Sequence, residues 1–148
     1  IIDVDKFKEI NDTWGHNTGD EILRKVSQAF YDNVRSSDYV FRYGGEEFMV
    51  ILTETTLQQA TLLLEGLRRR IADHAIKAGG KTFTVTVSIG LAEFNSHPDF
   101  QRVIEKADQA LGFQAVHVLV QGVGEQAGEQ HQGLMPRCRA TMPPVMLW

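Results

Sequence analysis

Four carboxylates in two short motifs could perform metal-dependent chemistry. Asp3 and Asp5 stand one residue apart in a strand-like segment, so their side chains share one face of a sheet. Glu46 and Glu47 follow a Gly-Gly dipeptide typical of a hairpin turn, which could bring them beside the aspartates. Hard cations such as Mg²⁺ prefer oxygen ligands and usually bind one or two carboxylates plus substrate phosphates. The cluster therefore indicates a metal site for nucleotide chemistry, although any one of these acids alone is also typical of a solvated strand end.

Two motifs for other chemistry fail on inspection. Asp3 and Asp5 could open a calcium-binding EF-hand loop, but Phe7 stands where that loop needs an oxygen ligand and Lys8 where it needs glycine. The glycines at 122–127 have dinucleotide-binding spacing, yet no carboxylate follows about 20 residues later and no second strand fits. A Walker-type phosphate loop is also missing from the sequence, so P-loop hydrolysis is excluded.

The segments that carry the carboxylates alternate between strand-like and helix-like patterns, which predicts a mixed α/β fold. Gly44-Gly45 tolerates the backbone angles of a tight turn and leaves room for a nucleotide against it. A helix capped by Thr18 or Asp20 should follow the first loop. We expect strands at 1–5, 38–43, 47–52 and 83–89, a helical turn at 6–11, a loop at 15–19, and helices at 20–34, 60–75 (closed by 79–80) and 99–111, where regular structure ends.

Composition limits the class of protein. The chain has 148 residues, 43% of them apolar, which suffices for one globular domain. A net charge of −4 argues against nucleic-acid binding, so any phosphate site must be local. The lone Cys138 and the lack of a membrane-spanning or signal segment favour a cytoplasmic domain without direct membrane contact. The chain begins without Met inside a strand-like segment, so we expect a larger parent protein with an upstream regulatory domain. The parent protein could be attached to a membrane.

The sequence changes character after Leu111. Residues 112–148 contain no Lys, Asp, Asn, Ser, Ile or Tyr, yet hold most of the Met and Pro residues. We interpret 1–111 as an N-terminally truncated globular domain. The remainder reads as an aberrant tail, which is either frame-shifted or disordered, with genuine divergence as the alternative.

A series of motifs in the first part of the chain resembles the GGDEF family of diguanylate cyclase catalytic domains. The resemblance extends from Ile1 to about Leu111, and the signature appears in its GGEEF form. The motifs are Asp3-Val4-Asp5-Lys6-Phe7-Lys8, Asn11-Asp12, Gly15-His16, Gly19-Asp20, Phe41-Arg42-Tyr43-Gly44-Gly45-Glu46-Glu47-Phe48, Ser88-Ile89-Gly90 and Ala107-Asp108-Gln109-Ala110-Leu111.

The resemblance implies a fold, a reaction and a metal site. Members of this family condense two GTP molecules into cyclic di-GMP and two pyrophosphates, on a fold with a mostly antiparallel central sheet related to nucleotidyl cyclases and polymerase palm domains. By matching position, Asp3, the backbone carbonyl of Val4 and Glu46 would hold Mg²⁺ or Mn²⁺. Glu47 would either assist the metal or activate the 3′-hydroxyl. Because the product joins two GTP molecules, two domains must face each other in a homodimer.

The resemblance also implies nucleotide contacts. Asn11 and Asp20 would read the guanine base, Lys8 and the amides of Phe7 and Lys8 would bind the triphosphate, and the Gly44-Gly45 backbone would lie against the substrate. For Asn11 the alternative is a turn residue, for Asp20 a helix cap, and for Lys8 a surface lysine.

The same resemblance implies a second binding site, and the sequence also departs from the family pattern at one position expected to bind phosphate. Arg35 and Asp38 match the RxxD product-binding inhibitory site, although a solvated turn with an internal ion pair would have the same sequence. Ala115 stands where the family has a phosphate-binding Lys, and the later Arg is not recognisable. A binding module for cyclic di-GMP or GTP with little catalysis is therefore the alternative to an enzyme, ahead of a dimerisation domain with vestigial carboxylates.

Overall fold

The computed structural model describes residues 1–94, 99–111 and 116–119. Its main sheet has five strands in the order β2-β3-β1-β6-β7, and a separate hairpin pairs β4 with β5. The strands are β1 (Ile2–Val4), β2 (Tyr39–Arg42), β3 (Glu47–Ile51), β4 (Ile76–Ala78), β5 (Lys81–Phe83), β6 (Val87–Ala92) and β7 (Val116–Leu119). The helices are α1 (Phe7–Trp14), α2 (His16–Asn33), α3 (Leu57–Asp73) and α4 (Phe100–Gln109).

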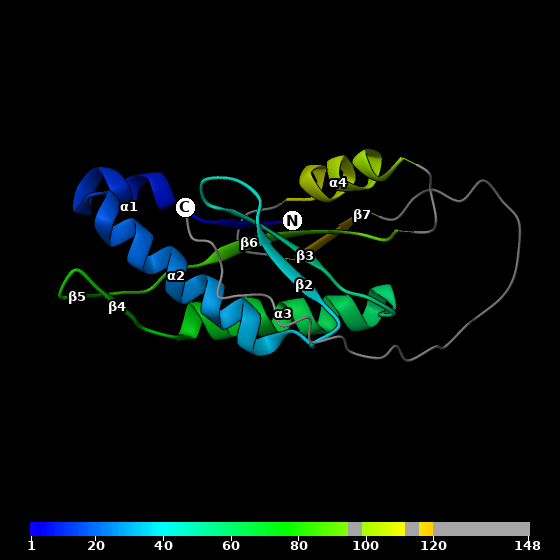
Figure 1. Cartoon of the computed structure of the whole chain (residues 1–148), viewed down its shortest axis with the longest axis horizontal. Helices are drawn as coiled ribbons and strands as arrows, with labels where there is room; N and C mark the ends of the chain where they lie inside the picture. The colour runs from blue at the N-terminus through cyan, green and yellow to red at the C-terminus, as the bar shows by residue number, and fades with distance from the viewer. Residues whose placement is uncertain (95–98, 112–115, 120–148) are drawn as a thin grey trace, which may run out of the picture.

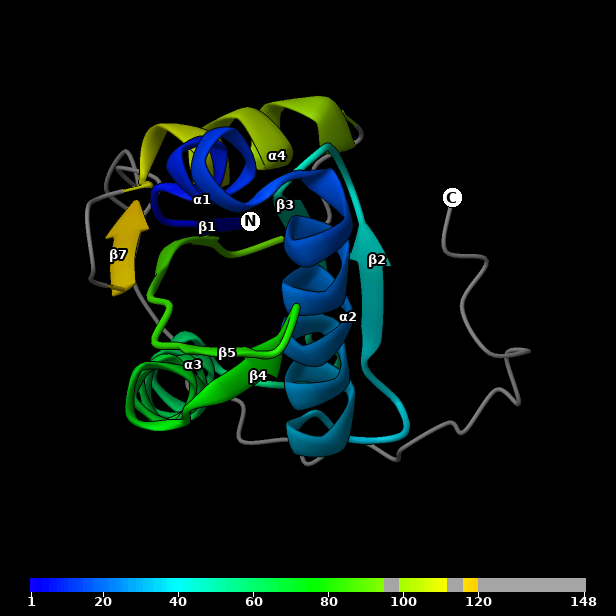
Figure 2. The ribbon, with the colours of Figure 1, turned by 90° about the vertical axis from the view of Figure 1, so that its left-hand side faces the viewer.

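The main sheet is antiparallel at every junction except β6 with β7, which run parallel. The predicted mixed α/β class with a mostly antiparallel sheet is therefore confirmed. Helices α2 and α3 cover one face of the sheet and α4 covers the other (Figure 1). Turned by a quarter, the molecule shows the β4-β5 hairpin beside α2 and α3 (Figure 2).

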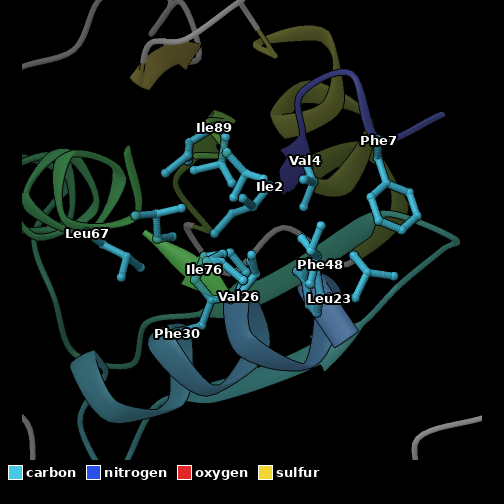
Figure 3. Packing of buried hydrophobic residues seen from close by; sticks show 14 of the residues in the cluster. Ile2, Val4, Phe7, Leu23, Val26, Phe30, Phe48, Leu67, Ile76 and Ile89 are labelled. Carbon is cyan, nitrogen blue, oxygen red and sulfur yellow. The ribbon is translucent and has the colours of Figure 1, made fainter. Parts of the chain in front are cut away.

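The hydrophobic core lies between the sheet and the α2-α3 layer. Ile2 and Val4 of β1 point into it, and there the Phe30 ring of α2 packs edge-on against Phe48 of β3 at 5.0 Å between centroids (Figure 3). Successive strand residues face opposite sides of a sheet, so burying Ile2 and Val4 turns Asp3 to the other face. Burial of the apolar residues thus fixes where the carboxylates point.

The predicted loop at 15–19 is wrong, because α2 already begins at His16. Only Gly15 separates α1 from α2, and its φ of 83° lies in the region that favours glycine. Neither Thr18 nor Asp20 caps α2, whose N-cap is Gly15 without a side-chain bond. The Thr18 hydroxyl instead donates to the carbonyl of Trp14 at 2.9 Å, which ties the two helices together at a sharp corner.

The second half of the chain also departs from the prediction. Gly79 and Gly80 do not close α3 but form the turn of the unpredicted hairpin β4-β5. Helix α3 begins with a capping box in which the Thr56 side chain accepts from the Gln59 backbone amide. The strand predicted at 83–89 is divided, since β5 ends at Phe83 and β6 begins at Val87.

Helix α4 lies where it was predicted, capped by the Asp99 side chain. Phe100 of this helix is 62% exposed, whereas Ala107 is buried. A Cβ at Gly90 would collide with the Ala107 carbonyl, so the glycine lets α4 lie directly on β6. The prediction that regular structure ends near Leu111 is wrong for 116–119, which form β7; the rest of the predicted tail lies outside the described residues.

Candidate active site

The carboxylates meet where β1 passes between β3 and β6. Asp3 lies directly opposite Glu47 in the antiparallel pairing of β1 with β3, and opposite Ser88 in the pairing with β6. Opposite residues in such a ladder have Cβ atoms about 4.5–5.5 Å apart. One residue before β3, the Glu46 carbonyl accepts from the Val4 amide at 3.2 Å. The register therefore brings Asp3, Glu46 and Glu47 to one site, as the motif spacing suggested.

Acidic neighbours act on Asp3 in this cluster. The pKa of Asp3 is raised to about 6, first by burial and then by the charges of Glu46, Glu47 and Asp5, in that order of importance. Like charges placed opposite each other across strands also destabilise the pairing. A cation at this site would relieve both effects.

The carboxylate of Asp5 is already hydrogen-bonded within the fold. Its side chain is buried, and its two carboxylate oxygens accept hydrogen bonds from the hydroxyls of Thr86 at 2.6 Å and Ser88 at 2.5 Å. The end of β1 is thereby fastened to the start of β6. Of the four carboxylates singled out from the sequence, Asp5 is the one whose oxygens accept hydrogen bonds from side chains in the described part of the chain.

The hairpin turn holds the Glu47 side chain. The Glu47 carbonyl accepts from the amides of Tyr43 at 2.8 Å and Gly44 at 3.2 Å, and a Cβ at Gly44 would collide with the Glu47 carboxylate. Gly44 is therefore needed for the carboxylate to fold over the turn. At Gly45, no atom of the described residues lies within 4 Å of the corresponding position.

Arg42 is not among the predicted site residues, but it supports the turn. Its guanidinium donates to the carbonyls of Gly44 at 3.3 Å and Gly45 at 2.7 Å. The arginine closes the turn from the β2 side. It thereby helps to fix the positions of Glu46 and Glu47, which directly follow the Gly44-Gly45 turn. Its position two residues before the Gly-Gly dipeptide is the one sequence signal that could have indicated this contact.

The predicted metal ligands are two carboxylates and one carbonyl. Within the described residues no group of three or more His, Cys, Asp or Glu side chains is placed to hold a metal ion. A Mg²⁺ ion needs fewer protein side chains, because it keeps waters and takes oxygens from substrate phosphates. The excess negative charge around Asp3, with Glu46 as the strongest neighbouring charge, fits such a cation.

The predicted nucleotide contacts lie on α1 and the start of α2. Asn11 is half-buried on α1 and packs against Gly19 of α2, next in sequence to Asp20, which is exposed. The two predicted base readers thus meet at the α1-α2 corner. Lys8 is exposed in the first turn of α1, whereas the side chain of Phe7 is in the core.

The predicted product-binding residues occupy one tight turn before β2. The Asp38 carboxylate is buried and accepts from the Arg35 amide at 2.8 Å and the Thr53 amide at 3.2 Å. Asp38 therefore holds the turn together through two backbone amides, whereas the alternative interpretation of this motif supposed an ion pair between the two side chains. The Arg35 guanidinium makes no hydrogen bond or ion pair within the described part of the chain.

Residues 1–114 match the profile of the family described as diguanylate cyclase, GGDEF domain. This chain is a GGDEF domain. It is 63% identical over 112 residues to the diguanylate cyclase DosC of Escherichia coli K12, an alignment that covers 75% of this chain and 24% of DosC. The GGDEF domain thus spans about a quarter of the length of that curated relative.

Solved structures agree with this assignment. The GGDEF domain of DgcB from Caulobacter crescentus, solved in complex with c-di-GMP, superposes with a TM-score of 0.73 at 32% identity, covering 79% of this chain and 74% of that one. The active GGEEF domain of a diguanylate cyclase from Vibrio cholerae gives 0.67 at 32% identity, covering 79% and 78%. No helix in the described part of this GGDEF domain is long and apolar enough to cross a membrane. Ala115, where the family's lysine was expected, lies outside the described residues.

Proposed function

We propose that this GGDEF domain is a diguanylate cyclase that condenses two GTP molecules into cyclic di-GMP and two pyrophosphates. The observation that carries the proposal is the register that sets Asp3 opposite Glu47, with Glu46 beside them. Three acidic groups meet at a glycine turn, and the pKa of Asp3 is raised to about 6 by burial and by its acidic neighbours. Such a site suits a cation and nucleotide phosphates.

Asp3, Glu46 and the Val4 carbonyl would hold the cation, Mg²⁺ or Mn²⁺. When bound, it neutralises phosphate charge and lowers the pKa of the attacking hydroxyl. Asn11 and Asp20 bind the guanine base through its acceptor and donor edges. Lys8 and the first amides of α1 bind the triphosphate, and the Gly44-Gly45 backbone lies against the substrate.

In the reaction, the 3′-oxygen of one GTP bonds to the α-phosphorus of the other, and the bond from that phosphorus to the β-phosphate bridging oxygen breaks. The hydroxyl proton passes to Glu47, and pyrophosphate leaves. The same exchange in the opposite direction closes the ring. Because each domain holds one GTP, two copies must face each other, so turnover requires a dimer at least transiently.

Incubating the purified chain with GTP and MgCl₂, and separating the products by chromatography and mass spectrometry, tests this proposal. We expect cyclic di-GMP, its loss with EDTA, and its loss in Glu46→Ala. Glu105→Ala, an exposed change on α4, is the matched control and should retain activity. If neither this chain nor its parent protein forms cyclic di-GMP, the proposal is wrong.

A second proposed role is product binding at Arg35 and Asp38. It is supported by the Arg35 guanidinium, which no described residue bonds, on a turn held by Asp38. If calorimetry shows tight cyclic di-GMP binding that Arg35→Ala removes, but no turnover occurs in the parent protein, the domain is a sensor rather than an enzyme.

We further propose that the catalytic domain is residues 1–111 and that residues 112–148, apart from strand β7 at 116–119, are an aberrant tail that is frame-shifted or disordered. The family match ending at residue 114 supports a boundary near this point. Sequencing the encoding DNA, and comparing the activity of the chain with that of a version carrying an unshifted C-terminal frame, tests it. Equal activity and an intact reading frame would contradict the proposal.

A further inference from the structure

Gly19 lies where local preferences disfavour glycine. It is a buried residue within the first turns of α2, and alanine is the better helix former at such a position. A glycine that breaks a local rule calls for a packing reason. Here the reason is the neighbouring helix α1.

A side chain at position 19 has no room. A Cβ built on Gly19 would collide with the Asn11 Oδ1 atom, and would stand 3.0 Å from Asn11 Cγ and from the Phe7 ring. Phe7 is fixed in the core, so the carboxamide of Asn11 is the group that would have to move. The α1-α2 corner can close on Asn11 only because residue 19 lacks a Cβ.

The contact also fixes which end of the Asn11 carboxamide faces outward. Oδ1 is buried against Gly19 without a hydrogen-bond partner, while Nδ2 is not among the buried unpartnered atoms and bonds to no described residue. A glycine Cα–H favours an oxygen over an amino group at this contact, since it is a weak hydrogen-bond donor. The acceptor is therefore turned inward, and the donor is left free for a ligand.

We propose that Gly19 is a specificity-determining positioning residue, which holds the Asn11 carboxamide so that its N–H donors meet the 6-keto oxygen of guanine. Adenine carries an amino group at that place, which would confront one donor with another. This inference rests on the proposed function, because it assigns the orientation of one of the two proposed base readers. Asp20, next to Gly19, has a different proposed role: its carboxylate accepts hydrogen bonds from the N–H donors of the base.

The test compares the Kd values of GTP, 6-thio-GTP and inosine triphosphate by calorimetry, in a Glu47→Gln background that blocks turnover. 6-Thio-GTP replaces the 6-keto oxygen with a poorer acceptor, whereas inosine triphosphate lacks only the 2-amino group. We expect Gly19→Ala to weaken GTP binding about 10-fold, the worth of one hydrogen bond. It should also bring the ratio of the 6-thio-GTP affinity to the GTP affinity towards one. The ratio of the inosine triphosphate affinity to the GTP affinity should stay unchanged.

Gly66→Ala is the matched control, since a Cβ at this glycine within α3 meets nothing within 4 Å. It should change neither ratio. Circular dichroism checks folding, and if Gly19→Ala alone is unfolded, the double variant Asn11→Ala/Gly19→Ala should fold, because the colliding carboxamide is gone. In the Asn11→Ala background, Gly19→Ala should leave both ratios as they are.

An unchanged 6-thio-GTP to GTP ratio in a folded Gly19→Ala variant that still binds GTP would overturn this inference and leave the proposed function standing. The inference would also be overturned if adding Gly19→Ala to the Asn11→Ala variant changed the ratio of the 6-thio-GTP and GTP affinities further. Absence of GTP binding by both this chain and its parent protein, before any change at position 19, would overturn the proposed function, and this inference with it.

Discussion

Asp3 of β1 lies directly opposite Glu47 of β3, so that two like charges face each other across neighbouring strands. The pairing of Ile2 with Phe48 in the core fixes this register, because a slip of β1 by one residue would turn Ile2 away from the core. Core burial thus enforces an unfavourable charge pair. That pair is stable only because the core contributes more than the repulsion costs.

Stability without divalent cations should fall as pH rises from about 4 to about 6. The pKa of Asp3 is about 6 in the folded chain against an ordinary 3.8, so the folded state holds this proton more tightly, and that advantage is lost as pH rises through the folded value. Thermal unfolding at pH 4, 5, 6 and 7.5 in EDTA measures the loss.

Mg²⁺ should restore stability above pH 6, where Asp3 is ionised; a cation present at a hundred times its Kd adds about 2.7 kcal/mol. The control is Asp3→Asn, which should flatten this pH dependence and remove most of the response to Mg²⁺. NaCl at matched ionic strength separates specific binding from screening. A wild-type Tm that does not change with Mg²⁺ at pH 7.5 would contradict the proposed metal site.

Gly44→Ala should lower kcat strongly, because its Cβ collides with the Glu47 carboxylate and displaces the proposed base. A misplacement of about 1 Å can cost on the order of 100-fold in rate. Steady-state kinetics of cyclic di-GMP formation measures it. Gly45→Ala is the control, since its Cβ meets nothing within 4 Å, and it should spare kcat while raising KM if GTP lies against this turn. Equal effects of the two changes on kcat would argue against the Gly44 contact.

Asp38→Ala and Arg35→Ala should separate stability from product binding. Asp38 accepts two backbone amides while buried, so its loss should cost about 1–3 kcal/mol of unfolding free energy. Replacing the half-buried Arg35 should leave stability almost unchanged and weaken cyclic di-GMP binding. Urea denaturation and calorimetry measure the two effects. Stability loss from Arg35→Ala as large as that from Asp38→Ala would show that this arginine has a structural role.

Acid should break the ion pairs of α3. Hydrogen bonds from Arg68 and Arg69 lower the pKa of Glu65 to about 2, from an ordinary 4.5. Their stabilising contribution is present above pH 4.5 and lost as pH falls through about 2. Glu65→Gln should therefore destabilise the domain at pH 7, by less than about 1 kcal/mol because the ion pairs lie on the surface of α3, and have no effect near pH 2. Glu105→Gln on α4 is the control, and equal effects of Glu65→Gln at both pH values would contradict this account.

Local patterns predicted the main helices and the hairpin but failed at the corners. The residues at 15–19 read as a loop because two glycines enclose short polar side chains, yet Gly15 alone makes the turn and Gly19 packs inside α2. Gly79-Gly80 read as a helix end because glycine commonly follows one. Its role as a hairpin turn depends on contacts far away in sequence, including the bond from the Gly79 amide to the Glu21 carboxylate at 2.9 Å.

By itself, the sequence determined the family, the α/β class and the set of carboxylates, because residue type and spacing suffice for these. Only the tertiary structure decided their separate positions: Asp5 is bound by the Thr86 and Ser88 hydroxyls, whereas Asp3 is left opposite Glu47. It also showed Gly44 and Gly19 making room for side chains of this same chain. The physical reason is that register and close contact between segments depend on how the core packs, which no local pattern contains.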